Sequence, residues 1–279
     1  ISSITEILMR DSNKNKYTGE LSLGLICGNA FVSGPLVKDK TGFSLGVRRT
    51  WLDAISAPTL AIMNAIDKSK GKKTMAGYAF TDLNVKIGHN FSPSLNASVM
   101  AYYSNDRLKF GERLFNEKKS DEDVEGFEEN SNKFGWGNSG VCATLNYKTQ
   151  KTSLEGVAYW SKYNSQYEQL HEYHSDVTDE LSYGKLFETT QNEISDFGAR
   201  INFNHRFDER YKVSSGAEWI NHNYLPEGLE SLRIVKGKES KTNNISERVG
   251  ANEMSLWVEG SFTPVKMLSA SIGLRQVNY

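Results

Sequence analysis

The stretch YAFTDLNVKIGHNFSPSLNASVMAYY, residues 78–103, alternates two kinds of side chain on either side of a short turn. Before the turn, one row holds Ala79, Thr81, Leu83, Val85 and Ile87, the other holds Phe80, Asp82, Asn84, Lys86 and Gly88, and the apolar row resumes at Leu95, Ala97, Val99, Ala101 and Tyr103. A period of two residues is that of a β-strand, whose successive side chains point to opposite faces. In the turn Ser92-Pro93-Ser94, proline fixes φ and serine bonds to nearby backbone. The stretch therefore predicts a β-hairpin with one apolar and one polar face.

The same hairpin pattern recurs along the chain. Apolar rows with a period of two run through residues 141–160, 197–219 and 254–274, each interrupted by a short polar turn. Upstream, the pattern predicts strands at residues 21–25 and 43–47, with Gly34-Pro35-Leu36-Val37-Lys38-Asp39-Lys40 as a turn between them, and a shorter strand from Ile4 to Arg10. The sequence thus predicts an all-β, antiparallel up-and-down sheet of about eleven strands.

The connections between the hairpins are of two kinds. The turns within hairpins are short, whereas the segments between hairpins, residues 51–75, 104–135, 162–193 and 222–251, are long and mostly polar. Short turns at one end and long loops at the other are typical of bacterial outer-membrane barrels. We therefore expect a transmembrane β-barrel segment with short periplasmic turns and long extracellular loops, located in the cell outer membrane.

The polar rows distinguish a membrane barrel from a soluble β-sandwich. They place charged and amide side chains opposite the apolar rows: Asp82, Asn84, Lys86, Asp196, Arg200, Asn202, Asn204 and Glu218. A packed core would desolvate these groups, whereas a water-filled or plugged lumen keeps them hydrated or paired. The barrel is favoured, and a soluble β-sandwich binding module with long insertions is the alternative.

Composition narrows the class further. With 38% hydrophobic residues, 24% charged residues and a mean hydropathy of -0.53, the chain is too polar for a helical membrane protein, and no apolar run reaches the length of a spanning helix. Aromatic residues, at 11%, suit the girdles of a barrel. A net charge of -1 argues against a nucleic-acid partner, and two distant cysteines, Cys27 and Cys142, do not form a disulfide framework. Because Ile1 begins no leader pattern, we expect any export signal to lie upstream or to have been removed.

The first part of the chain resembles a known family. The resemblance is carried by Leu8-Met9-Arg10-Asp11-Ser12-Asn13, by Tyr17 to Gly24, by the segment Gly34 to Lys40, and by Val47-Arg48-Arg49-Thr50-Trp51-Leu52-Asp53. The string Arg-Arg-Thr-aromatic-Leu-Asp after a Gly-Pro-Leu turn is similar to the third strand of the barrel in TonB-dependent receptors of Bacteroidota. The resemblance covers residues 1 to about 110, and the rest of the chain shares only the hairpin architecture.

This resemblance implies a twenty-two-stranded barrel with an N-terminal plug, energised through TonB, that takes up a nutrient such as a chelate, vitamin, glycan or peptide. The expected partners are outer-membrane lipid, TonB through a plug domain outside this chain, and a surface lipoprotein lid. Residues 1–279 are then one partial barrel without the plug, whose open edges pair with the remaining strands or with other chains. Alternatively, the chain ends naturally at Tyr279, because alternation up to a terminal aromatic resembles an outer-membrane assembly signal.

No catalytic, cofactor or metal residue is assigned, ligand-binding residues are not identifiable, and we expect no enzymatic activity. The alternative is a small outer-membrane barrel enzyme, with Asp82, Asp106, Asp196 and His222 near the rim, although no sequence spacing pairs them. Residues 135–140 spell GxGxxG, but a strand should follow instead of the helix of a dinucleotide site, so we expect glycines at a strand start and Trp136 in an aromatic girdle.

Features of the expected loops have ordinary explanations. His171-Glu172-Tyr173-His174 is one residue short of the HExxH zinc motif, although Glu168, His171 and His174 could share a helical face. The acidic run at residues 121–129 is expected to be a solvated loop. Residues 51–66 surround Pro58, and the part after it predicts a short amphipathic helix within the loop or at the barrel mouth. Arg48-Arg49 suggests a wall or plug contact.

Overall fold

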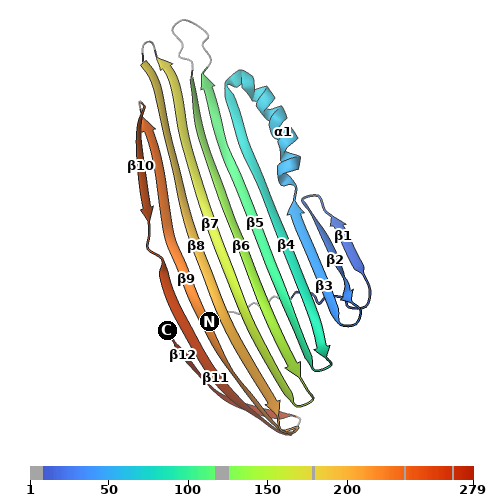
Figure 1. Cartoon of the computed structure of the whole chain (residues 1–279). Coiled ribbons are helices and arrows are strands. Elements are labelled where there is room, and N and C mark those ends of the chain that lie inside the picture. Colours follow the sequence, from blue (N-terminus) through green and yellow to red (C-terminus); the bar gives the residue numbers. More distant parts are fainter. Residues whose placement is uncertain (1–8, 117–125, 178–179, 236, 266) are drawn as a thin grey trace.

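The computed structural model describes residues 9–116, 126–177, 180–235, 237–265 and 267–279. Within these ranges the chain forms one antiparallel sheet of twelve strands and a single α-helix, α1 (Leu52–Asp67), followed by the 3-10 helix η1 (Lys68–Lys70) (Figure 1). The strands are β1 (Thr18–Leu23), β2 (Cys27–Val37), β3 (Thr41–Thr50), β4 (Lys72–Ser92), β5 (Leu95–Asn116), β6 (Gly126–Lys148), β7 (Thr152–Val177), β8 (Glu180–Arg206), β9 (Tyr211–Val235), β10 (Lys238–Ile245), β11 (Val249–Val265) and β12 (Leu268–Asn278). Each strand pairs with the next, except that β9 pairs with β10 in its upper half and with β11 in its lower half. The predicted all-β, up-and-down architecture is confirmed.

The strand boundaries differ from the prediction in three places. The segment from Gly34 to Val37, expected in a turn, belongs to β2, where Pro35 lies at a register shift against β3. Proline is tolerated at such a bulge because one ladder hydrogen bond is already missing there. Strand β10 occupies part of a predicted loop. Residues 4–8 of the strand expected from Ile4 to Arg10 lie outside the described residues, and Met9 and Arg10 are not in a strand.

The four long connections do lie at one end of the sheet, as predicted (Figure 1), but most of their residues are not loops. They continue the strands, so that β7 and β8 reach 26 and 27 residues. The prediction of long loops was wrong here because polarity was equated with irregular backbone, whereas a polar segment still forms strands when its neighbours supply hydrogen-bond partners.

One face of the sheet, here called the outer face, carries a continuous apolar band across the lower half of the strands. Cross-strand registry aligns one row of it through eight strands: Phe43, Ile87, Val99, Ala143, Ala158, Ala199, Trp219 and Met254. Side chains of this row are exposed on the surface of the sheet; Val99 is 52% exposed and Met254 is 49% exposed. Among the described residues the one buried large hydrophobic side chain is Leu225, which is 6% exposed. No second sheet packs on the band within the described residues, so the β-sandwich alternative has no structural support.

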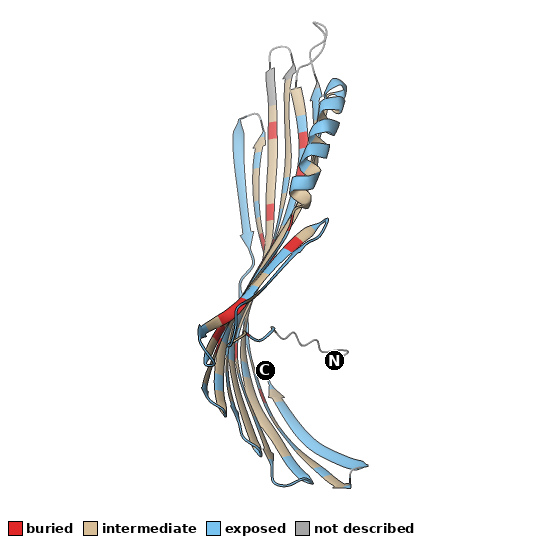
Figure 2. Cartoon of the chain, turned by 90° about the vertical axis from the view of Figure 1, so that its right-hand side faces the viewer, coloured by how far each residue is buried: buried red, intermediate tan, exposed pale blue. Residues whose placement is uncertain are grey.

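The opposite face, here called the inner face, is polar at the same height, and residues 9–14 lie against it. Lys86 binds Asp11 at 2.6 Å, and the backbone N–H of Asn13 donates to Ser33 Oγ at 2.7 Å. Gly42 and Gly88 let this segment approach, because a side chain at Gly42 would meet the Asn13 carbonyl at 2.9 Å. The segment lies on the concave side of the curved lower half of the sheet (Figure 2). The inner face is therefore the lining of the curve.

Helix α1 covers part of an unpaired strand edge. Strand β3 pairs with β4 only as far as Thr81, so the upper part of β4 has no strand partner on that side. There the Asn64 side chain of α1 replaces the hydrogen bonds of a neighbouring strand. Its Oδ1 accepts from the Thr74 N–H at 2.7 Å, and its Nδ2 donates to the Thr74 carbonyl at 2.9 Å. The predicted amphipathic helix is present, but it begins at Leu52 and contains Pro58. No helix in the described part of the chain is both long and apolar enough to cross a membrane.

Aromatic rings on the inner face cover glycines of the neighbouring strand. Tyr159 lies directly opposite Gly198, and a Cβ added to that glycine would stand 2.4 Å from the ring. Trp257 covers Gly216 in the same way, at 2.2 Å. Such contacts hold adjacent strands in one register, because the ring fits only against a residue without a side chain.

We expect Gly198→Ala to destabilise the sheet by about 1–3 kcal/mol, because the added methyl group overlaps the Tyr159 ring and forces a shift. The free energy of unfolding in detergent and urea measures the effect. Gly156→Ala is the matched control, since nothing lies within 4 Å of its added Cβ. Equal losses in the two variants would show that the ring contact has no role.

Candidate functional site

Above the apolar band, the inner face carries a cluster of aromatic side chains on β4, β6 and β7. Tyr78 stacks near Trp136 with ring centroids 6.3 Å apart, and Trp136 lies 4.9 Å from Phe134. Phe80 and Tyr167 extend the cluster on its two sides, at 6.2 Å from Tyr78 and 6.4 Å from Phe134. We call these five residues the aromatic wall. Phe134 and Tyr167 are each 36% exposed, so the wall offers ring surface to a ligand.

Polar groups fix the orientation of the aromatic wall. The Arg48 guanidinium lies 4.8 Å from the centroid of the Phe80 ring, within the range of a cation–π contact. The Tyr78 hydroxyl donates to Asp106 Oδ1 at 2.7 Å, and the Tyr167 hydroxyl donates to Asn132 Oδ1 at 2.5 Å. Burial, followed by the bond to Asp106, raises the pKa of Tyr78 to about 12. Tyr78 therefore stays protonated at neutral pH and acts as a hydrogen-bond donor.

The sequence contains a signal for this wall that the loop interpretation missed. Alternation continues past Tyr103 but changes phase, so that Asn105, Arg107 and Lys109 now face outward and Leu108 and Phe110 face inward. In the lower half of the same strand the apolar side chains face outward instead. The change of phase marks the level at which the outer face stops being apolar.

The four candidate catalytic residues form two separate groups on the inner face. His222 Nδ1 lies 2.9 Å from Asp196 Oδ1, and its Nε2 lies 4.0 Å from Glu253. Asp82 and Asp106 lie on β4 and β5, whereas Asp196 and His222 lie on β8 and β9. Three strand spacings separate β5 from β8, about 14 Å. The sheet thus does not bring the four residues into one reaction centre.

The remaining sequence motifs lie within strands. Residues 135–140 are in the middle of β6, so the glycines do not begin a strand, and Trp136 belongs to the aromatic wall and not to an outward girdle. Glu168, His171 and His174 lie in β7, where the alternation of the strand puts His171 on the face opposite the other two, so the helical face considered for them does not exist. Of the acidic run, residues 121–125 lie outside the described residues. Glu129 lies in β6, is buried and pairs with Arg113.

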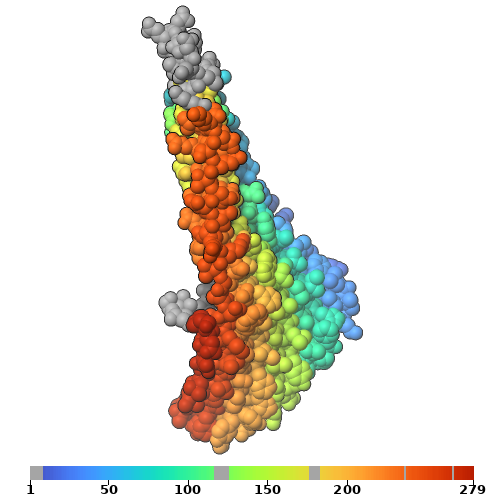
Figure 3. All heavy atoms as spheres, turned by 60° about the vertical axis from the view of Figure 1, so that its left-hand side comes forward, coloured from blue at the N-terminus to red at the C-terminus, as the bar shows by residue number. Residues whose placement is uncertain are grey.

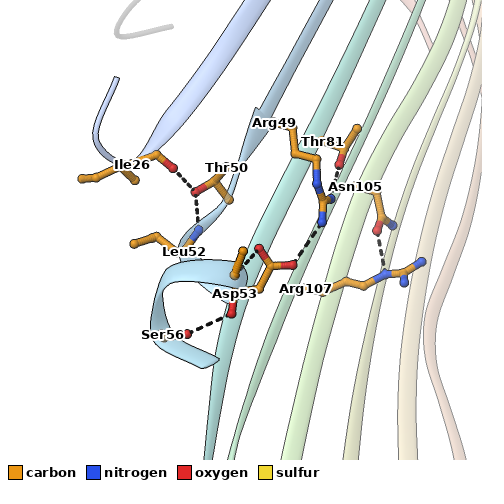
Figure 4. Close-up of polar contacts among 10 residues, drawn as sticks. Ile26, Arg49, Thr50, Leu52, Asp53, Ser56, Thr81, Asn105 and Arg107 are labelled. Carbon is orange, nitrogen blue, oxygen red and sulfur yellow. Dashed lines mark hydrogen bonds and ion pairs between the residues drawn. The ribbon is translucent and has the colours of Figure 1, made fainter. Parts of the chain in front are cut away.

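The structure also places the potential metal ligands and the basic pair. Among the described residues, no three His, Cys, Asp or Glu side chains are placed to hold a metal ion. Of the basic pair, Arg48 contacts the wall ring of Phe80, and Arg49 faces outward, where it bonds to Thr81 and Asp53 (Figure 4). Arg48 thus contacts the neighbouring strand β4, and a contact with a plug stays a prediction.

The upper outer face is joined by ion pairs across strands. Glu193 of β8 accepts from Arg248 Nη1 at 2.8 Å and from Lys162 Nζ at 2.7 Å. These hydrogen bonds, first from Arg248 and then from Lys162, hold the pKa of Glu193 below its ordinary value of 4.5. These two ion pairs of Glu193 link β8 to β7 and to the connection before β11.

We expect the stabilising contribution of Glu193 to be fully present above pH 4.5 and to be lost as the pH falls through its lower folded-state pKa. The free energy of unfolding, measured against pH for the native protein and for Glu193→Gln, should differ most above pH 4.5 and converge in acid. Glu209→Gln, in the exposed turn after β8, is the control. A difference that is constant over the whole pH range would contradict the assignment.

Comparison with known proteins gives weak similarities. No family model matches the chain. No curated protein matches it. Similar solved structures include the ferric yersiniabactin uptake receptor FyuA from Yersinia pestis, at 7% identity and a TM-score of 0.31 over 92% of this chain and 46% of that one. They also include the siderophore receptor PirA from Acinetobacter baumannii, at 9% identity and a TM-score of 0.23 over 90% of this chain and 62% of that one. The chain spans less than two thirds of the length of either, and at these TM-scores the likeness carries no argument about function.

Proposed function

We propose that this chain is part of the wall of an outer-membrane barrel that acts as a TonB-dependent receptor for a nutrient. The observation that carries the proposal is the continuous apolar band on the outer face opposite a polar inner face. A surface of open apolar side chains across so many strands needs an apolar surrounding, and a bilayer supplies one.

The height of the band fits a bilayer. In β5 it runs from Leu95 to Tyr103, nine residues, which is within the range of a tilted membrane strand. At about 3.3 Å per residue and a tilt of about 40°, nine residues rise about 23 Å, close to the apolar height of outer-membrane barrels. Above this level the outer face becomes polar, as it would on leaving the lipid.

The open edges support the proposal that further strands complete the barrel. In the described part of the chain, β1, β10 and β12 each pair on one side only. In the space-filling view, β10 above and β11 and β12 below form one uncovered edge (Figure 3). An unpaired edge is unfavourable inside a bilayer because its backbone groups find no water. The missing strands would come from the rest of a longer polypeptide or from other chains.

The path of residues 9–14 supports an N-terminal plug. This segment lies on the inner face, where it bonds to Ser33 and Lys86, before the chain enters β1 at the edge of the sheet. The end of a domain that precedes this segment would lie inside the lumen, where a plug contacts TonB from the periplasmic side.

The aromatic wall lies above the band on the same face. It would then meet a nutrient entering from outside, and a surface lipoprotein lid would cover the mouth. The candidate carboxylates lie apart, so the proposal is transport and not catalysis.

Fractionation of cells expressing the full-length protein tests the proposal. We expect the protein in the outer membrane, with a heat-modifiable mobility on gels. Val99→Arg should impair assembly, because a cation at the middle of the band costs about 2–4 kcal/mol in lipid.

The matched control is Met100→Arg, since the neighbouring side chain points to the inner face, opposite Lys86 and Cys142. Its assembly should be close to normal. A soluble wild-type protein, or equal tolerance of both variants, would rule out the membrane assignment.

A further inference from the structure

A hollow of about 800 Å³ lies on β4, β5 and β6 directly above the apolar band. Part of its floor is made by residues without large side chains, including Gly77, Ala79 and Gly135. A Cβ placed on Gly77 would meet nothing within 4 Å, so the space above it is open. Thr81 and Asn105 add a hydroxyl and an amide at its lower end.

The cations around this hollow belong to the outer face. In the pairing of β5 with β6 there is no register shift, and in its pairing with β4 the single shift lies at the lower turn. Side chains four residues apart therefore share a face, which puts Arg107 on the side of Val99 and Tyr103. Lys109 and Lys133 lie directly opposite each other on the same side.

The lower end of the hollow lies at the depth of lipid headgroups. Its lower row, Arg49, Thr81 and Asn105, lies two residues above Leu83 and Tyr103, the upper limit of the band, and Arg107 lies four residues above it. With a rise of about 3.3 Å per residue and a tilt of about 40°, these rows stand about 5 and 10 Å beyond the hydrocarbon. Headgroups occupy roughly the first 5–8 Å on each side of the hydrocarbon layer, so the lower row lies at their depth. The Arg107 side chain reaches this row, because its Nε donates to Asn105 Oδ1 at 2.8 Å. Lys109, six residues above the band, stands about 15 Å beyond the hydrocarbon and adds positive charge above the headgroup layer.

The charge of the hollow is positive. Four cations line it, Arg49, Arg107, Lys109 and Lys133, against the two carboxylates Asp53 and Glu168. Each carboxylate already holds one cation, Asp53 with Arg49 at 3.0 Å and Glu168 with Lys133 at 2.9 Å.

The other two cations have no such partner. Within the described residues, Arg107 and Lys109 form no ion pair, and Arg107 bonds only through Nε, to Asn105 Oδ1 at 2.8 Å. Figure 4 shows Arg49 held between Thr81 and Asp53, with Arg107 on the adjoining strand. The outer nitrogens of the Arg107 guanidinium remain available for an anion.

We propose that this hollow binds the phosphate of a lipid headgroup in the outer leaflet. Arg107 would bind two phosphate oxygens with its planar guanidinium, Lys109 would add charge, and the hydroxyl of Thr81 and the amide of Asn105 would bond to the adjoining headgroup. A lipid is favoured over a dissolved anion because the hollow is on the face that continues the apolar band, where acyl chains would lie against Val99 and Tyr103. This site rests on the proposed membrane location.

The test uses full-length protein extracted in mild detergent from outer membranes, stripped of lipid and examined by native mass spectrometry. Dioleoyl phosphatidic acid is the probe, and dioleoylglycerol, which has the same chains without the phosphate, is the lipid control. Arg107→Gln combined with Lys109→Gln should weaken binding of the phosphatidic acid by about tenfold or more, because the guanidinium contact and a second positive charge are removed. Lys185→Gln is the matched variant, since Lys185 also carries a positive charge above the band but pairs with Glu172 outside the hollow.

We expect binding of the phosphatidic acid only, reduced by the double variant and unchanged in Lys185→Gln. Equal binding of dioleoylglycerol, or an unchanged affinity in the double variant, would overturn the site. Displacement by inorganic phosphate at equal concentration would assign the hollow to a dissolved anion and also overturn it. Heat-modifiable mobility of the same samples reports the barrel independently, so a protein that never reaches the membrane contradicts the proposed function, and an inserted protein with no phosphate preference contradicts the headgroup site alone.

Discussion

Cross-strand hydrogen bonding is the constraint on which the rest of this structure depends. Because each strand pairs with its neighbour without interruption through the lower half, a side chain that faces outward on β3 is aligned with outward side chains as far as β11. A slip of one residue between any two strands would reverse the faces of every strand beyond it. Rings such as Tyr159 over Gly198 restrain that slip, since the ring fits only opposite a glycine. The apolar band is thus a product of registry as much as of composition.

The polarity of the two faces of the sheet changes at the level where the apolar band ends. Below it, apolar side chains face outward and charged groups face the lumen, where the segment around Asp11 is bound. Above it the arrangement reverses, with ion pairs such as Glu193 with Lys162 on the outer face and the aromatic wall on the inner face. One set of long strands therefore presents an apolar surface to lipid and, higher up, an aromatic surface to whatever enters the mouth. The same change of phase places Arg107 outward, just above the lipid boundary.

The predictable part of this fold is the part with a strong period of two. The hairpin through Leu83, Pro93 and Val99 was found from the sequence because its faces differ sharply in polarity. The upper strands were missed because stretches such as Arg107-Leu108-Lys109-Phe110 alternate in the opposite phase and follow a polar segment, so they resembled a loop. Strand β10 has no apolar face at all, and only pairing with β9 makes it a strand. Contacts between distant segments, such as Asn64 with Thr74 or the aromatic wall itself, depend on registry that no single segment encodes.

The most direct test of this account is whether the outer face of the lower half touches lipid. Variants that keep one tryptophan each, with the others replaced by phenylalanine, can be reconstituted in bilayers containing brominated phospholipid, which quenches fluorescence on contact. Trp160 and Trp219 lie on the outer face and should be strongly quenched, whereas Trp136 and Trp257 lie on the inner face and should be quenched little. Equal quenching of all four, or stronger quenching of the inner pair, would contradict the membrane orientation on which the proposed transport role rests.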